Sequence, residues 1–302
     1  MIDIANEANA TRNTIEAYYD ERVEGKLRDF TDFNPRIEAA IQTIAEWAPP
    51  APRRVLEIGC GIGATSWRMA RAWSQAEVIG ADISSRSIEV ARNCFRLPNL
   101  AYHLGLIREG VLAGKFDLVV LMDVYEHIVQ NDRAALHAAI NPFLADEARV
   151  IMTFPTPALQ QHGRLRDPAG MQPVDEDVTV EDILKFAEQT CTDLLYYREV
   201  GIWQYGDYAH AVLGRYEKLA NVALREYHAG GLVAVKHYIR RLLGLNLLPS
   251  PARRDYLGSD VLRPSPRQST AAFCVPESER QRMLRQLRQP IAKANTGAQS
   301  RC

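Results

Sequence analysis

The chain has 302 residues, a formal net charge of −1 and a hydrophobic fraction of 47%. No stretch approaches the ~20 uninterrupted apolar residues of a membrane-spanning helix, and the near-neutral charge gives no electrostatic case for nucleic-acid binding. The first residues lack a basic region followed by an apolar run, so they predict no secretory signal and a cytoplasmic location.

The first predicted unit is a helical N-terminal cap over residues 1–50. Apolar residues recur at helical spacing between residues 13 and 47, with Ile37, Ile41 and Ile44 on one face. A cluster of prolines that begins at Pro49 ends this pattern.

Residues 51–215 alternate short β-branched runs with helical stretches, which is the pattern of a parallel sheet with crossover helices. Strands are expected at RVLEIG, AEVIGAD, LAYHLG, FDLVVLMD and RVIMTF, and a hairpin of DLLYYREVGIW and YAHAVLGRY closes the sheet. Residues 118–122 are apolar without alternation, which suits a strand buried on both faces. The predicted fold class is therefore α/β and Rossmann-like: a mostly parallel seven-stranded sheet with an antiparallel last strand, a helical N-terminal cap and a helical C-terminal extension.

The segment from Pro155 to Asp177 is predicted to be a long loop beyond the carboxyl end of the fifth strand, because it is rich in proline and lacks periodicity. The acids at 175–177 are interpreted as a solvated turn, with contact to a cationic substrate or a metal ion as the alternative. Thr179 then has the position of an N-cap for a helix over 180–190.

Residues 216–302 are predicted to form a helical, locally basic C-terminal extension, with helical patterns over 216–248 and 277–287. Basic residues at 236, 240 and 241 share the first of these patterns with apolar ones. We expect this segment to pack on the preceding domain, and an amphipathic helix on a membrane surface is the alternative.

A glycine turn follows the first strand. Gly59, Gly61 and Gly63 have the spacing G-x-G-x-G, which differs from the G-x-G-x-x-G of dinucleotide enzymes. Glu57 lies just before this turn in an otherwise apolar strand, where a carboxylate would repel a pyrophosphate and tolerate a cationic ligand. Asp82 ends the next strand, where a carboxylate can accept hydrogen bonds from both hydroxyls of a ribose.

With these motifs, residues 55–215 resemble the class I S-adenosylmethionine-dependent methyltransferases, and within them the small-molecule group. The resemblance implies S-adenosyl-L-methionine as the cofactor. It implies that the first motif surrounds the methionine and ribose parts of that cofactor through Glu57, Gly59, Cys60, Gly61 and Gly63.

The same resemblance assigns the remaining cofactor contacts. It places Asp82 at the ribose, Ile83 against the adenine, Met122 and Asp123 beside the methionine end, and Tyr18 and Tyr19 in a cap helix that closes over the cofactor. Leu106 stands where the family often has an acidic or amide residue for the adenine amino group, so backbone groups are expected to make that contact here.

Three histidines are candidates for a base that removes a proton from the acceptor: His127, His162 and His210. The favoured acceptor is a small polar molecule, methylated on an oxygen of a sugar or natural product. An amine acceptor and a non-catalytic S-adenosylmethionine-binding module are the alternatives, while the glycine spacing and Glu57 argue against a nicotinamide-dependent oxidoreductase. No metal site and no nucleic-acid partner are predicted, and a homodimer is left open.

Overall fold

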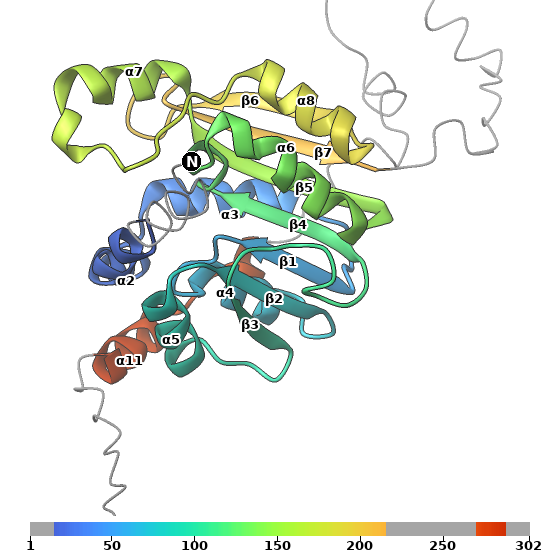
Figure 1. Ribbon diagram of the computed structural model, residues 1–302. Helices are drawn as coiled ribbons and strands as arrows, with labels where there is room; N and C mark the ends of the chain where they lie inside the picture. The colour runs from blue at the N-terminus through green and yellow to red at the C-terminus, as the bar shows by residue number, and fades with distance from the viewer. Residues whose placement is uncertain (1–14, 216–269, 288–302) are drawn as a thin grey trace, which may run out of the picture.

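The computed structural model describes residues 15–215 and 270–287, and it contains a seven-stranded sheet of order β3-β2-β1-β4-β5-β7-β6 (Figure 1). The strands are β1 (Arg54–Ile58), β2 (Glu77–Asp82), β3 (Leu100–Leu104), β4 (Phe116–Met122), β5 (Leu144–Pro155), β6 (Asp193–Val200) and β7 (Tyr208–Gly214). β7 pairs antiparallel with β5 and β6, and the other strand pairings of this sheet are parallel. The predicted sheet and its antiparallel last strand are confirmed.

Helices cover both faces of the sheet (Figure 1). α3 (Pro35–Trp47), α4 (Ala64–Ala72) and α5 (Ser85–Cys94) lie on one face, and α6 (Gln130–Ile140) and α8 (Val180–Thr190) lie on the other. Leu118 and Val120 of β4 pack into the first layer, while Val119 and Leu121 pack into the second. This double burial explains why the strand is apolar on consecutive residues.

The described part of the N-terminal cap, from residue 15 onward, is helical as predicted, but it divides into shorter helices. Residues 15–21 are helical, and α2 (Val23–Asp32) ends at Phe33, whose φ of 55° is left-handed. Asn34 then begins α3 by accepting a hydrogen bond from the Arg36 backbone N–H at 3.0 Å, with Pro35 at the first helical position. The break lets α2 leave the sheet and lie across the carboxyl ends of its strands.

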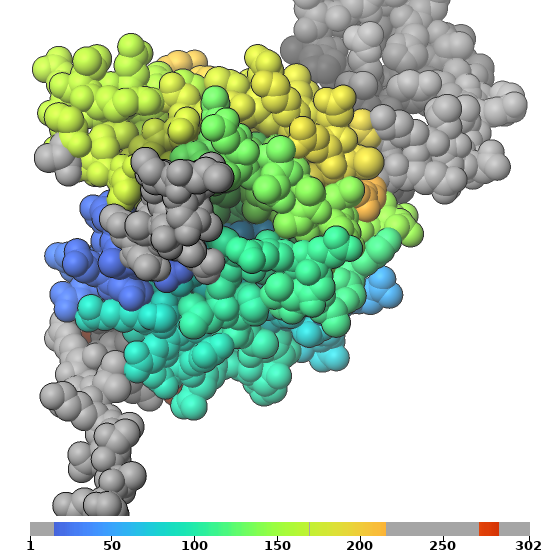
Figure 2. Space-filling model, in the orientation of Figure 1, coloured from blue at the N-terminus to red at the C-terminus, as the bar shows by residue number. Residues whose placement is uncertain are grey.

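The prediction of a loop from 155 to 177 was wrong for most of residues 157–170. This part contains α7 (Pro157–Arg166) and a 3-10 turn, η3 (Pro168–Gly170). Thr156 caps α7, since its hydroxyl accepts from the Leu159 backbone N–H at 3.3 Å. α7 projects beyond the sheet and buries little apolar surface, so its sequence shows no apolar stripe. α7 (yellow-green) and α2 (blue) bound the same side of the molecule (Figure 2).

Residues 270–287, the described part of the C-terminal extension, pack against the N-terminal cap. η4 (Thr270–Phe273) packs on α3 and α4, and α11 (Glu277–Leu287), a helix that the sequence predicted, packs on α2 and α5. Arg68 on α4 donates to the Phe273 carbonyl at 2.8 Å, and Arg280 on α11 lies 3.5 Å above the ring of Phe33. The predicted helix over 216–248 lies outside the described residues. Within the described ranges, no helix is both long and apolar enough to span a membrane.

Candidate functional site

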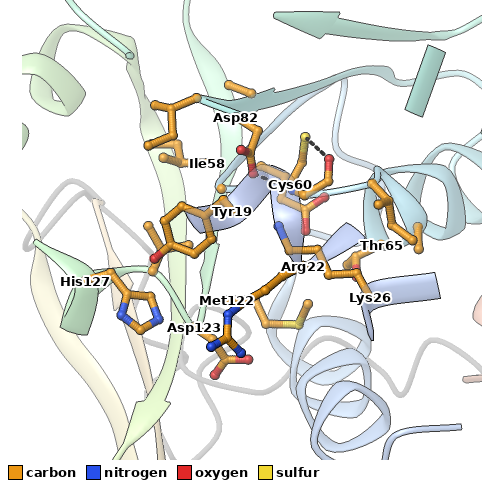
Figure 3. Close-up of a pocket in the computed structure, with 18 of the residues that line it drawn as sticks. Tyr19, Arg22, Lys26, Ile58, Cys60, Thr65, Asp82, Met122, Asp123 and His127 are labelled. Atoms are coloured by element: carbon orange, nitrogen blue, oxygen red, sulfur yellow. Dashed lines mark hydrogen bonds between the residues drawn. The ribbon is translucent and has the colours of Figure 1, made fainter. Parts of the chain in front are cut away.

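A cavity of about 1160 Å³ lies at the carboxyl ends of the parallel strands, beneath α2 and helical residues 15–21. Most of the predicted site residues line it: Tyr19, Glu57, Gly59, Cys60, Gly61, Asp82, Ile83, Leu106, Met122, Asp123 and His127. Figure 3 shows Asp82 and His127 on opposite sides of this space, with the Tyr19 ring between them. The topology therefore brings the two ends of the predicted site into one pocket.

The glycine turn is held to the second strand by its backbone. The N–H groups of Gly59 and Cys60 both donate to the carbonyl of Ala81, at 2.7 and 2.9 Å. Gly59 has a φ of +73°, and a Cβ there would come 2.2 Å from Cγ2 of Val124. A side chain at this position is therefore excluded by both backbone conformation and space. Gly63 does not line the cavity. It is the N-cap residue of α4 and has a left-handed φ of +81°.

Asp82 holds the same turn from the other side. Its Oδ2 accepts from the Gly61 N–H at 2.7 Å and its Oδ1 accepts from the Ser84 N–H at 2.8 Å. The carboxylate is buried, with 8% of the residue exposed, yet it borders the cavity. Because a carboxylate oxygen can accept more than one hydrogen bond, both oxygens keep capacity for ligand hydroxyls.

Glu57 is almost completely buried, with 1% exposure, and it lines the cavity floor. The hydroxyl of Ser66 on α4 donates to its Oε2. Burial raises the pKa of Glu57 to about 8, and the negative charge of Asp82 adds to this increase. Without a positive ligand nearby, this carboxyl is therefore mostly protonated at neutral pH.

Arg36 and Asp123 form a partly buried ion pair on the cavity wall. Arg36 Nη1 lies 2.9 Å from Asp123 Oδ2, and Asp123 has a left-handed φ of 55°. Burial raises the pKa of Asp123 while the Arg36 guanidinium opposes that increase. Among described residues, neither Nε of Arg36 nor Oδ1 of Asp123 has a hydrogen-bond partner. The side chains of Tyr208 and Thr153 also interact with Arg36 and Asp123, respectively. The pair nevertheless keeps one buried donor and one buried acceptor that a polar ligand in the cavity can satisfy.

The tyrosines of the cap separate in the structure. Tyr19 lines the cavity and lies 5.3 Å from the Nζ of Lys26, whereas Tyr18 is outside the lining and stacks under Arg22. Asp20 fastens this helix to α5, because its Oδ1 accepts from the Ser84 hydroxyl at 2.5 Å and from the Arg86 N–H at 3.1 Å. The cap is thereby attached at the rim beside Asp82.

Of the three predicted histidines, the cavity contains His127. His162 is exposed on α7 and is not part of the lining. His210 is buried in β7, where its Nδ1 lies 2.7 Å from the Thr43 hydroxyl, and burial lowers its pKa to about 4. The structure thus places His162 and His210 outside the cavity lining, so neither is positioned to act as the base.

Several lining residues were not anticipated from the sequence: Lys26, Arg36, Gln172 and Val174. The first two lie in the cap, where helical spacing shows which residues are polar but not which of them face a ligand. The last two belong to the segment after α7. No local sequence pattern predicts that this segment returns to the cavity. Within the described part of the chain, no group of three or more His, Cys, Asp or Glu side chains is arranged to hold a metal ion.

Comparison with known proteins matches residues 55–147 to the family model described as a methyltransferase domain. The ubiquinone biosynthesis O-methyltransferase of Cereibacter sphaeroides is 37% identical over 116 residues, which are 34% of this chain and 46% of that protein. The magnesium-protoporphyrin O-methyltransferase of Rhodobacter capsulatus is 29% identical over 130 residues, 37% of this chain and 56% of that protein. The chain thus spans about half the length of the curated relatives it matches.

Among solved structures, the magnesium protoporphyrin IX methyltransferase from Synechocystis PCC 6803 with bound SAH has a TM-score of 0.54 to this chain at 17% identity. The match covers 68% of this chain and 99% of that chain. At this identity, the likeness shows the fold. These matches confirm the resemblance to class I S-adenosylmethionine-dependent methyltransferases that the sequence motifs indicated.

Proposed function

We propose that the chain is an S-adenosylmethionine-dependent methyltransferase that transfers the methyl group to an oxygen atom of a small molecule. The observation that carries this proposal is the cavity in which Asp82, the glycine turn and the Arg36–Asp123 pair converge. The names of the curated relatives, which are O-methyltransferases, support the oxygen acceptor.

The residues present fit this cofactor part by part. The Asp82 oxygens can accept from the ribose hydroxyls, and Ile83 and the half-exposed Leu106 provide apolar contact for the adenine. The unsatisfied Nε of Arg36 and Oδ1 of Asp123 complement a carboxylate and an ammonium group, the two charges of an amino-acid end. Glu57 supplies a carboxyl that becomes ionised when a positive ligand approaches.

When bound, S-adenosylmethionine supplies a methyl group on a positively charged sulfur, whose C–S bond breaks as the acceptor oxygen bonds to the carbon. The protein aligns the acceptor and excludes water from it, which supplies much of the rate. We assign the role of base to His127, which takes the proton released by the acceptor hydroxyl. Tyr19, whose ring lies 6.1 Å from that of His127, lines the same cavity beside this base.

The acceptor side of the cavity is largely apolar, with Ile128, Val129 and Leu136 in its wall. We therefore favour a natural product with an apolar ring and a hydroxyl over a sugar. This preference refines the expectation drawn from the sequence.

Two measurements test the proposal. Calorimetry with S-adenosylhomocysteine should show binding that weakens at least ten-fold in Asp82→Ala. Mass spectrometry after incubation with S-adenosylmethionine and a panel of phenols, alcohols and amines should show a mass gain of one methyl group on a hydroxyl compound. Methylation confined to amines would refute the oxygen acceptor, and binding without transfer to any compound of a broad panel would favour a non-catalytic module.

A further inference from the structure

The segment after α7 returns to the cavity and packs against the 3-10 turn that carries His127. This turn, η1 (Tyr125–His127), follows β4 after two residues, Asp123 and Val124. The Glu176 N–H donates to the Glu126 carbonyl at 2.9 Å, and Gln172 and Val174 line the cavity. The acids at 175–177, interpreted from the sequence as a solvated turn, follow these lining residues directly, and Glu176 is bonded to the turn that carries His127.

Asp175 lies against the imidazole of His127. Its Oδ1 is 3.2 Å from His127 Nδ1, and both side chains are only 11% exposed. Its other oxygen, Oδ2, accepts from the Gln172 N–H at 2.7 Å. The carboxylate is thus fixed by its own backbone on one side and faces the imidazole on the other.

A neighbouring carbonyl decides which ring nitrogen carries the proton. His127 Nδ1 is 2.8 Å from the Val174 carbonyl oxygen, which can only accept a hydrogen bond. Nδ1 must therefore be the protonated nitrogen in the neutral ring, and Nε2 is left as the nitrogen that can accept a proton.

We propose that Asp175 is a positioning residue for the methyl transfer: together with the Val174 carbonyl it holds His127 with Nδ1 protonated, so that Nε2 is the nitrogen that takes the acceptor proton. This inference rests on the proposed function, because it assigns a partner to the base named there. In the reaction, the acceptor O–H proton passes to Nε2, the O–C bond forms and the C–S electron pair stays on sulfur. The carboxylate of Asp175 stabilises the imidazolium that results.

Several charged or titratable groups surround His127. They are Glu126 on its own turn, whose Oε1 is 3.6 Å from Nε2, Asp175 on the returning segment, Asp123 at the end of β4 and Tyr19 on the cap. Burial opposes protonation of His127, but Glu126 and Asp175 outweigh it and raise the pKa of His127 to about 9. The rate should therefore rise with pH up to about 9, as the neutral base forms.

Asp175→Asn tests the assignment, because it removes the charge and keeps a similar shape. The pKa of His127, followed by NMR of the ring nitrogens and assigned with His127→Gln, is expected to fall by about one unit. The midpoint of the pH dependence of kcat should fall by the same amount, while KM for S-adenosylmethionine changes less than about two-fold. Asp177→Asn is the matched control, because Asp177 pairs with Arg164 and its side chain is 45% exposed.

The outcomes separate the two proposals. If methyl transfer occurs and Asp175→Asn leaves both the His127 pKa and the pH profile at their original values, the role of Asp175 is refuted. If no methyl transfer is found in the unsubstituted protein, the proposed function fails, whatever the NMR shows. Asp175→Glu keeps the charge and should keep a raised His127 pKa, so it provides the same comparison if the asparagine variant folds poorly. If the His127 pKa falls as much in Asp175→Glu as in Asp175→Asn, the assignment is also contradicted.

Discussion

Replacement of Glu57 by glutamine should stabilise the protein when no cofactor is bound, and the gain should depend on pH. The carboxyl has a pKa of about 8 in the folded chain and an ordinary value of 4.5 when exposed. At pH 7 the unfolded chain ionises this group and the folded chain does not. The difference destabilises the folded state by about 3 kcal/mol at pH 7, an order-of-magnitude value.

The sign follows from the raised pKa. Below pH 4.5 the Glu57 carboxyl is protonated in both the folded and the unfolded chain, so it does not lower the free energy of unfolding. As the pH rises from 4.5 toward 8, the unfolded chain loses this proton first and the free energy of unfolding falls. Glu57→Gln has no such loss, and the Ser66 hydroxyl can still donate to its amide oxygen. The variant should therefore resemble the unsubstituted protein near pH 4.5 and exceed it by up to about 3 kcal/mol at pH 7.

Urea titrations followed by circular dichroism at several pH values would measure this difference in the free energy of unfolding. Glu188→Gln, at an exposed position on α8, is the control and should show little change. A difference between Glu57→Gln and the original that does not change between pH 5 and pH 7 would refute the reasoning. The same variant should bind S-adenosylmethionine more weakly, since the negative charge that faces a cationic ligand is gone.

Three further outcomes are expected. Gly59→Ala should abolish binding of S-adenosylhomocysteine in calorimetry, because its Cβ would lie 2.2 Å from Val124. Gly25→Ala is the control and should leave the fold intact, because no atom lies within 4 Å of the new Cβ. Binding of S-adenosylhomocysteine by Gly59→Ala would contradict the prediction. Binding of S-adenosylmethionine at pH 7 should release a proton as Glu57 ionises, so the calorimetric enthalpy should vary with the ionisation enthalpy of the buffer, and an invariant enthalpy would count against it. Arg280→Ala should lower the free energy of unfolding by about 2 kcal/mol, because it removes the contact with Phe33 and the bond to the Thr31 carbonyl, while the exposed Arg282→Ala should not.

The sequence by itself determined the fold class and the cofactor end of the candidate site. Apolar runs such as 118–122, the glycine turn at 59–63 and the cap at Thr179 are signals within a few residues of one another. They depend on strand periodicity, on backbone conformations open to glycine and on local hydrogen bonds. Thr179 is the expected N-cap and forms a capping box with Asp182. Asp82 reaches the glycine turn because adjacent parallel strands end at the same edge of the sheet.

Only the tertiary structure decided which polar residues share the cavity. His210 and His127 were both candidate bases, yet the first pairs with Thr43 in the core and the second lines the pocket. Asp175 looked like a solvated acid and is held against His127. Arg36 reaches Asp123 because a helix break at Phe33 and Asn34 turns the cap. Such contacts join residues far apart in the chain, and they depend on where whole helices cross the sheet, which local periodicity does not specify.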